Sequence, residues 1–332
     1  MQFAVFGAGE MGVRALFQIG KEGISCFIDN KRKGNIEGIP IYSVEEYKDR
    51  FSAEQLIFIT SKKYRLQMEE QLKQNGLDNF VYFTPDRVMN SDVSKKLTAD
   101  EWGHLYNSSL AEKIANKLER REYSIQTREL LKLTAAGDKV LEIGCGSGET
   151  SAGLAMNGRK VSALDYSEGA LNLVKNVCSQ MGCGVNIYHL NATEKLPFCK
   201  NEFDCIFQAG LLEHFIQKER IEMLKNWNGI SEVMVSFIPN SHSIPYQMGK
   251  KLAEDRHTWP YGLEMPQFSL REDFELAGYR EVEEYTIGIE AALHFLPSDH
   301  YLRAAFEKAI AEGIDLCEWG QGYLLVTVGK SC

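Results

Sequence analysis

Short apolar runs alternate along most of the chain with longer segments in which apolar residues recur every three or four positions. The short runs predict buried strands, and the longer periodic segments predict amphipathic helices. The runs at 3–6 and 140–143 each lead into a glycine-rich turn and then into a helical segment. In both cases the next strand ends in an acid, first Asp29 and later Asp165. Two βαβ starts in one chain predict an α/β protein with two doubly wound domains.

The first domain is predicted to span residues 1–88, and a charge-rich helical connector is predicted at 89–125. The second domain is predicted to span 126–332. Expected strands lie at 3–6, 26–29, 38–42, 56–60, 80–83, 139–143, 160–164, 185–190, 203–207, 232–238, 279–286 and 323–328. Expected helices lie at 64–75, 150–156, 170–180 and 301–311. The second domain therefore has five strand–helix steps and then a late pair of strands.

A glycine run at Gly144, Gly146 and Gly148 separates the strand at 139–143 from the next helix. Glycines in such a turn let a ligand approach the backbone, and the unpaired amides of the helix N-terminus face that ligand. The run lacks the two-residue gap before the third glycine that dinucleotide-binding turns have. The spacing therefore argues against a pyrophosphate ligand.

Residues 142–148 resemble the first motif of class I S-adenosylmethionine (SAM)-dependent methyltransferases. Further segments are similar to later motifs of that family and follow in the same order: 165–167, 190–193, 196–198 with 203–207, and 208–214. The last of these contains a Leu-Glu-His sequence like that of the small-molecule branch of the family. The resemblance implies a mostly parallel seven-stranded sheet with a late antiparallel strand. It also implies SAM as cofactor and S-adenosylhomocysteine as product.

The same resemblance implies roles for single residues. Asp165 would accept hydrogen bonds from the ribose diol of SAM, and Glu142 would orient its methionine ammonium. Asn191 and Ala192 would border the adenine, although the family more often has Asp at the first of these positions. The implied cofactor-binding residues are Glu142, Gly144, Cys145, Gly146, Gly148, Asp165, Tyr166, Asn191, Ala192, Gln208, Ala209 and Gly210. The alternative is that these residues serve only as turns and helix caps.

His214 follows the fourth strand of the second domain, at the predicted cofactor edge. A histidine there could take the proton of a bound hydroxyl, which makes His214 the candidate catalytic residue. The alternative is that Glu213 and His214 brace the helix that begins there. An available base favours O-methylation over N-methylation.

A proline-rich insertion at 239–270 follows the fifth strand. Its prolines predict that no long helix crosses it. Its place over the carboxyl edge of the sheet predicts a substrate lid, with a loop packed for stability as the alternative. Candidate acceptor contacts are His242, Tyr246, His257, Tyr261 and Glu264. A second insertion, at 290–322, could complete the lid or form a dimer face.

Gly7, Gly9 and Gly12 follow the first strand in Gly-x-Gly-x-x-Gly spacing, and Asp29 follows at the interval expected for a ribose-binding acid. By motif alone this turn would bind NAD. Residues 1–88 also resemble the small Rossmann-like domains that precede sugar acetyltransferases and glycan-associated methyltransferases. Such a domain holds a nucleotide or nucleotide-sugar, or has a vestigial pocket, and the sequence leaves a docking role equally open.

Composition narrows the classes of partner. The chain has 37 Lys and Arg against 46 Asp and Glu, and its net charge of -9 argues against a general nucleic-acid binder. Its apolar runs are far shorter than the roughly 20 residues that span a bilayer. No signal peptide precedes the first strand, so we expect a cytoplasmic protein without a membrane segment. The eight cysteines form no CxxC pair and no zinc-type spacing with histidine, so we expect reduced thiols and no metal site.

These patterns predict a SAM-dependent methyltransferase that acts on a small polar or sugar-type acceptor, in glycan or natural-product biosynthesis. Two alternatives stay open. One is a bifunctional enzyme whose first domain uses NAD, and the other is a non-catalytic SAM-binding module. The sequence does not decide the oligomeric state.

Overall fold

A computed structural model describes residues 2–19, 21–61, 64–83, 98, 101–102, 108–256 and 258–331. The chain divides into two compact units. The first comprises Met1–Lys95 and Ala253–Gly262, and the second comprises Lys96–Leu252 and Leu263–Cys332. The domain boundaries expected after residues 88 and 125 stay predictions.

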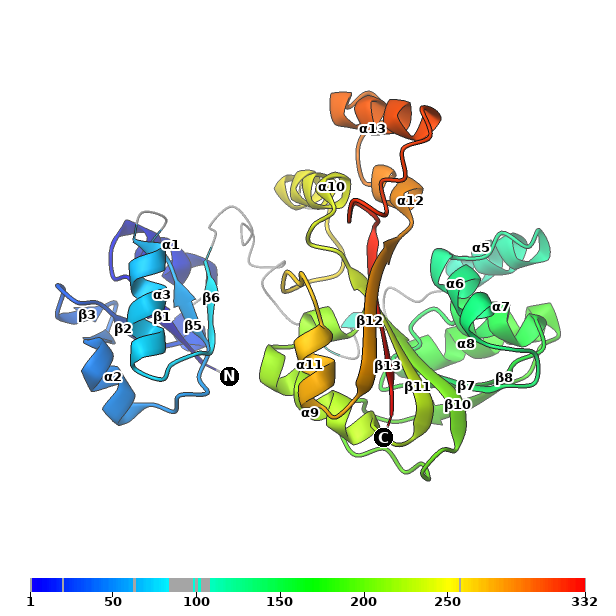
Figure 1. Ribbon diagram of the computed structural model, residues 1–332, viewed down its shortest axis with the longest axis horizontal. Helices are drawn as coiled ribbons and strands as arrows, with labels where there is room; N and C mark the ends of the chain where they lie inside the picture. Colours follow the sequence, from blue (N-terminus) through cyan, green and yellow to red (C-terminus); the bar gives the residue numbers. More distant parts are fainter. Residues whose placement is uncertain are drawn as a thin grey trace. The chain divides into compact units, whose positions relative to one another are not determined.

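The first unit is built on a six-stranded sheet in the order β3-β4-β2-β1-β5-β6 (Figure 1). Its strands are β1 (Phe3–Phe6), β2 (Ile24–Ile28), β3 (Gly34–Ile36), β4 (Ile39–Tyr42), β5 (Ile57–Ile59) and β6 (Phe80–Tyr82). Its helices are α1 (Glu10–Ile19), α2 (Val44–Arg50) and α3 (Arg65–Gln74), with a 3-10 turn η1 (Lys21–Gly23). Neighbouring strands are parallel except β3, which runs antiparallel to β4.

Both faces of this sheet are covered. Ala4 and Phe6 of β1 pack in one apolar cluster with side chains of α2 and α3, whereas Val5 packs in a second cluster with α1. Alternate residues of a strand point to opposite faces, so β1 is buried on both sides. This is the doubly wound arrangement predicted for the first domain.

The second unit is built on a seven-stranded sheet in the order β12-β13-β11-β10-β7-β8-β9 (Figure 1). Its strands are β7 (Lys139–Ile143), β8 (Lys160–Asp165), β9 (Val185–His189), β10 (Phe203–Ala209), β11 (Ser231–Pro239), β12 (Arg280–Ile287) and β13 (Leu324–Lys330). Only β13 runs against its neighbours, β11 and β12. The predicted class, a mostly parallel sheet with a late antiparallel strand, is confirmed.

The helices of the second unit are α5 (Ser108–Glu119), α6 (Ile125–Leu133), α7 (Glu149–Met156), α8 (Glu168–Met181), α9 (Gln217–Trp227), α10 (Ile244–Asp255), α11 (Arg271–Leu276), α12 (Ile289–Leu293) and α13 (Tyr301–Ala311), with a 3-10 turn η3 (Leu212–His214). Helices α10, α12 and α13 lie beyond the ends of β12 and β13 (Figure 1), whereas helices on both sides flank the sheet itself. Val140 of β7 packs with α6 and α7, whereas Leu141 packs with α9 and α11. The carboxyl ends of the central strands therefore stay available for a site, because the helices flank the sheet.

The expectation that no long helix crosses 239–270 was wrong, because α10 occupies Ile244–Asp255. Pro245 stands at the second position of α10, in the first turn, where a proline removes no helical hydrogen bond. The next proline, Pro260, comes only after the helix has ended. The positions of the prolines, and not their number, therefore determine where a helix can form in this segment.

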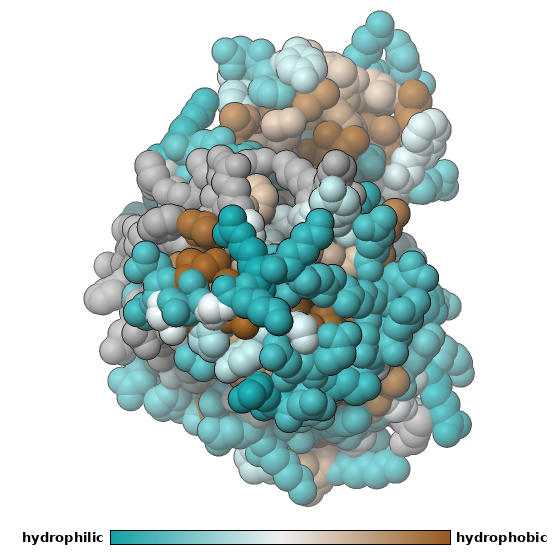
Figure 2. All heavy atoms as spheres, turned by 90° about the vertical axis from the view of Figure 1, so that its left-hand side faces the viewer, coloured by the Kyte–Doolittle hydropathy of each residue, from teal (hydrophilic) through white to brown (hydrophobic). Residues whose placement is uncertain are grey.

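The face shown in Figure 2 is covered mainly by hydrophilic side chains, and hydrophobic ones gather there in small patches. Within the described ranges no helix is long and apolar enough to cross a bilayer. The same residues contain no group of three or more His, Cys, Asp or Glu side chains placed to hold a metal ion.

Candidate active site

The turn after β7 needs glycine at three positions. Gly144, Gly146 and Gly148 have φ of +71°, +48° and +68°, a left-handed backbone that side chains rarely adopt. A Cβ on Gly148 would lie 2.5 Å from Cγ2 of Val174 in α8, and one on Gly144 would lie 3.1 Å from Cδ2 of Leu211. Gly144 and Gly148 therefore let the turn pack closely against Leu211 and Val174.

Asp165 links the end of β8 to this turn. Its Oδ2 accepts a hydrogen bond from the Gly146 amide at 3.0 Å, and its Oδ1 accepts one from the Ser167 amide at 2.9 Å. Burial raises the pKa of this carboxyl, and backbone hydrogen bonds from Gly146, Ser167 and Tyr166 oppose the rise. A carboxylate has about four acceptor sites, so Asp165 keeps acceptor capacity for a ligand hydroxyl.

Glu142 lies one strand away and is also buried. Its Oε2 accepts from the amide of Ser151 at 3.1 Å and from the Ser151 hydroxyl at 2.5 Å. Burial raises its pKa to about 8, the Ser151 hydrogen bonds lower it, and the nearby Asp165 carboxylate raises it further. Cys145, buried in the glycine turn, donates its amide to the Leu164 carbonyl at 3.0 Å.

Asn191 and Ala192, which we expect to lie beside the adenine of SAM, form hydrogen bonds within and around their own turn. Oδ1 of Asn191 accepts from the Thr193 amide at 3.1 Å and from its hydroxyl at 2.9 Å. The carbonyl of Ala192 accepts from Trp227 Nε1 at 3.0 Å. Tyr166, which follows Asp165, is 40% exposed. Asn and Asp side chains both fill such a turn-capping role.

Gln208 braces the end of β10. It is fully buried, with Nε2 2.5 Å from the Ser236 hydroxyl and Oε1 accepting from the Leu211 amide at 2.9 Å. Ala209 ends the strand, and Gly210 then turns the chain with φ of +77°. The Gln208 side chain thus shapes the turn, and the ligand-facing role expected for Ala209 and Gly210 stays a prediction.

His214 lies in η3, directly after that turn. Its Nδ1 lies 2.6 Å from the Leu263 carbonyl oxygen, and its ring meets the Trp102 ring edge-on at 5.4 Å between centroids. A carbonyl can only accept, so Nδ1 carries the proton and Nε2 is the basic nitrogen. This tautomer is the one that a general base requires.

Two of the predicted acceptor contacts meet directly. Oε2 of Glu264 accepts from the Tyr246 hydroxyl at 2.7 Å and from Lys250 Nζ at 2.5 Å. Lys250 was not predicted, and it stands one turn after Tyr246 on α10, a helix that the sequence analysis had not expected. Burial raises the pKa of Tyr246, so its hydroxyl donates as a neutral phenol.

The other acceptor candidates have different neighbours. His242 packs its ring against Phe268 at 4.9 Å between centroids. Tyr261 is 44% exposed and meets Trp259 edge-on within Ala253–Gly262, a segment of the first unit. His257 lies outside the residues that the structure describes.

Glu213 is the site residue whose character the sequence did not reveal. It is 3% exposed, and within the described part of the chain its Oε2 has no hydrogen-bond partner. Burial raises the pKa of its carboxyl well above the usual range, and the negative charge of Glu264 raises it further. The Leu-Glu-His motif was the available signal, but the sequence alone predicts Glu213 only as a brace for the helix that follows.

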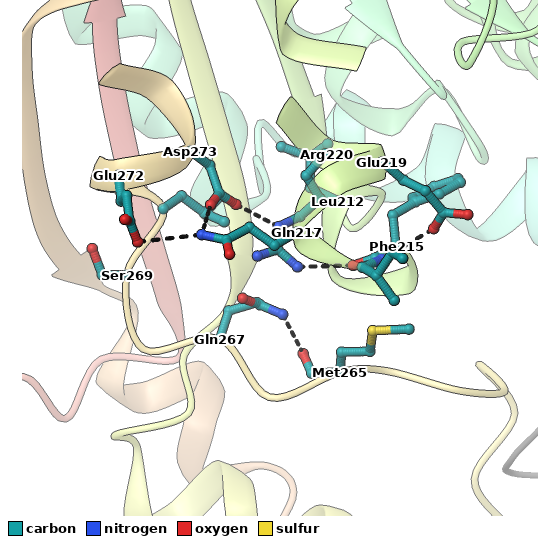
Figure 3. A network of polar contacts seen from close by, with 12 residues as sticks. Leu212, Phe215, Gln217, Glu219, Arg220, Met265, Gln267, Ser269, Glu272 and Asp273 are labelled. Carbon is teal, nitrogen blue, oxygen red and sulfur yellow. Dashed lines mark hydrogen bonds and ion pairs between the residues drawn. The ribbon is translucent and has the colours of Figure 1, made fainter. Parts of the chain in front are cut away.

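A buried ion pair holds the turn that carries Glu213 and His214. Arg220 on α9 donates through Nε to Asp273 Oδ2 on α11 at 2.5 Å, and through an η nitrogen to the Phe215 carbonyl at 2.8 Å (Figure 3). Gln217 adds a bond to Asp273 Oδ1 at 2.9 Å. The pair therefore connects α9, α11 and the residue that follows His214.

The first unit has its own glycine turn, between β1 and α1. Gly7 has φ of +112°, and a Cβ there would lie 2.5 Å from the Thr60 hydroxyl. A Cβ on Gly12 would lie 1.9 Å from the Gly7 carbonyl oxygen, whereas one on Gly9 would meet nothing within 4 Å. Gly7 and Gly12 thus serve close packing, and Gly9 leaves open space.

Asp29 of the first unit is held by backbone amides. Its Oδ2 accepts from Ala8 at 2.9 Å, and its Oδ1 accepts from Lys31 and Arg32, each at 2.8 Å. Burial pushes its pKa upward, but these hydrogen bonds and the Arg32 charge together hold the pKa below its usual value. Asp29 therefore stays ionised and shapes the turn around β1.

Residues 140–231 match the model of the methyltransferase domain family. The matched segment begins in β7 and ends at the start of β11 in the second unit. The glycine turn and Asp165 fall within this segment, as do Gln208 and His214.

Curated relatives match part of this chain. Over 95 residues it is 36% identical to the ubiquinone biosynthesis O-methyltransferase of Coxiella burnetii, which covers 29% of this chain and 39% of that protein. Over 79 residues it is 37% identical to the enzyme of the same name from Aromatoleum aromaticum, covering 24% and 34%. The chain thus matches well under half the length of these relatives.

A SAM-dependent methyltransferase of Archaeoglobus fulgidus is a solved structure similar to this chain. The TM-score is 0.45 at 16% sequence identity, over 62% of this chain and 91% of that one.

Proposed function

We propose that this chain transfers the methyl group of SAM to a hydroxyl of a small polar or sugar-type acceptor. The observation that carries the proposal is the hydrogen bond between Asp165 and the Gly146 amide, which holds a buried carboxylate against the glycine turn that follows β7. The match of residues 140–231 to the methyltransferase domain family supports the same reading.

The residues present fit SAM. The backbone of the glycine turn can approach a ligand because Gly144, Gly146 and Gly148 carry no Cβ. Asp165 is suited to the ribose diol, and Glu142 supplies a buried carboxyl suited to the methionine ammonium. When bound, SAM supplies a methyl group already activated by a positively charged sulfur.

The chain's own contribution to the reaction is alignment and removal of a proton. Methylation of a hydroxyl forms an O–C bond and releases the hydroxyl proton, which Nε2 of His214 accepts in our proposal. The Leu263 carbonyl holds Nδ1 and therefore orients the ring. The names of the curated relatives, O-methyltransferases, support a hydroxyl as the methylated group.

The acceptor would lie against the residues after β10 and β11, among them Tyr246 and Glu264. The likeness of the first domain to those of glycan-modifying enzymes is the support for a sugar-type acceptor. It also underlies our proposal of a role in glycan or natural-product assembly.

The test is a comparison of SAM binding between the unaltered chain and Asp165→Asn. Replacing a carboxylate that accepts two hydroxyls costs about 1.5–3 kcal/mol, so affinity by equilibrium dialysis should fall about tenfold to a hundredfold. Asp299→Asn, at an exposed position, is the matched control and should bind SAM normally.

The second measurement is S-adenosylhomocysteine formation with a panel of hydroxyl and amino acceptors, read by mass spectrometry. Product with a hydroxyl acceptor supports the proposal. If SAM does not bind, the proposal is lost. If SAM binds but no acceptor in a broad panel yields product, a non-catalytic SAM-binding module replaces it.

A further inference from the structure

Glu213 is a buried carboxyl with an unmet hydrogen-bonding capacity. It stands in η3 shortly after β10, it is 3% exposed, and Oε2 has no hydrogen-bond partner among the residues that the structure describes. Buried polar groups almost always have partners, because leaving one unpaired costs free energy. A group kept in this state at a carboxyl edge of the sheet is suited to bind a ligand.

The groups that face Glu213 do not balance its charge. Glu264 and Lys250 act on it electrostatically, and Tyr246 lies close enough to be affected by it in turn. Lys250 is bonded to Glu264 at 2.5 Å, with both side chains largely buried, and Tyr246 donates to the same Glu264 oxygen. Among these described residues two carboxyl groups share a single ammonium, so Glu213 has no cation of its own and burial keeps its carboxyl protonated until a cation binds.

The Glu213 carboxyl also lies beside the predicted cofactor edge. A Cβ on Gly210 would lie 3.5 Å from Glu213 Oε1, so the carboxyl folds back over the turn that ends β10. A group bound at Glu213 would therefore sit next to Gly210 and His214. This is where the acceptor belongs in the proposed function.

We propose that Glu213 binds an ammonium group of the acceptor, which makes the substrate class an amino sugar or another small amino alcohol. The inference rests on the proposed function for the methylated hydroxyl and adds the group that is recognised. An ammonium supplies both the hydrogen bond that Oε2 lacks and the positive charge that the two carboxyl groups lack. A neutral hydroxyl would supply only the first.

The test uses methylammonium as the probe, on the full chain without SAM. Thermal unfolding is measured at pH 7.5 in methylammonium chloride and in sodium chloride of equal ionic strength. Methylammonium should raise the Tm of the unaltered chain, and at ten times its Kd the unfolding constant should fall about elevenfold. Glu213→Gln should lose this response, and Glu281→Gln, on an exposed part of β12, should keep it.

A second measurement covers the case in which Glu213→Gln does not fold. The raised pKa of Glu213 means that the carboxyl must release its proton to pair with an ammonium. Calorimetric titration of the unaltered chain in two buffers of different ionisation enthalpy should then show proton release. Equal effects of methylammonium and sodium, or no proton release, would overturn the inference.

The two proposals fail separately. If SAM binds and methylammonium does not act through Glu213, the ammonium site is lost and the methyltransferase proposal stands. If methylammonium binds through Glu213 and SAM does not bind, the proposed methyl transfer is lost and the cation site stands on its own.

Discussion

Among single residues, three buried carboxyl groups lie in or just after neighbouring strands of the second sheet. Glu142 lies in β7, Asp165 at the end of β8, and Glu213 just after β10, and burial raises the pKa of all three. Each costs stability when it ionises, because a buried charge loses its hydration. Such a concentration of acid is suited to a cationic ligand, and SAM together with an ammonium-bearing acceptor is cationic.

The pH dependence of unfolding should reveal Glu142. Its pKa is about 8 in the folded chain and near 4.5 when unfolded, so the folded state holds the proton more tightly. Its contribution to stability is therefore present below pH 4.5 and is lost as pH rises toward 8, by up to about 1.4 kcal/mol per pH unit. Urea unfolding of Glu142→Gln at pH 5, 6.5 and 8 should lack this loss. Parallel pH profiles for the two proteins would contradict the assignment.

His214 can be tested separately from binding. His214→Asn keeps a side chain able to donate to the Leu263 carbonyl but removes the base, so kcat should fall about 10²–10⁴-fold while the Kd for SAM stays the same. An unchanged kcat would mean that His214 has a structural role through its hydrogen bond to Leu263 and does not transfer a proton.

Helices and strands could be predicted from the sequence where a local pattern of residues determines them. The strands β7, β8 and β10 follow from apolar runs that end at a glycine turn or an acid, and all three were predicted. Helix α10 was not, because its first-turn proline was counted as a helix breaker. The role of Glu213 could not be predicted because it depends on Glu264 and Lys250, which only the folded chain brings near it.

The contact between α9 and α11 gives a prediction at the element scale. Asp273→Asn removes the partner of a buried arginine, and breaking a buried ion pair costs about 3–5 kcal/mol. Thermal unfolding should report this loss, and kcat should fall as well, because Arg220 also holds the Phe215 carbonyl after His214. Glu281→Gln, which breaks an exposed pair with Lys330, is the control and should change little. A stable Asp273→Asn variant would show that α11 is held by apolar packing alone.

At the scale of the whole molecule, the two units reuse one design with different results. Both place a glycine turn and an acid at adjacent strand ends. Backbone amides hold the acid in each unit, those of Gly146, Ser167 and Tyr166 at Asp165 and those of Ala8, Lys31 and Arg32 at Asp29. Only at Asp29 does an arginine charge, that of Arg32, also help to hold the pKa of the carboxyl below its usual value, so the acid of the first unit already has a positively charged partner.

We therefore expect no saturable binding of NADH to the full chain in a fluorescence titration. The carboxylate that would accept the ribose hydroxyls already holds the amides of Ala8, Lys31 and Arg32. Saturable binding that Gly9→Trp abolishes would contradict this expectation and support the bifunctional alternative. Mass spectrometry of ligands released on denaturation would report on both units in one measurement.

The position of β13 has a consequence for how the second unit is assembled. Leu324–Lys330 lies between β11 and β12, strands that come earlier in the chain, and joins them. Until those residues have emerged from the ribosome, β11 presents an open edge and β12 has no partner in the sheet. An open edge invites pairing with other chains. During synthesis the unit is thus exposed to aggregation until a late moment, and a stop codon before residue 324 should give insoluble protein and not a smaller enzyme.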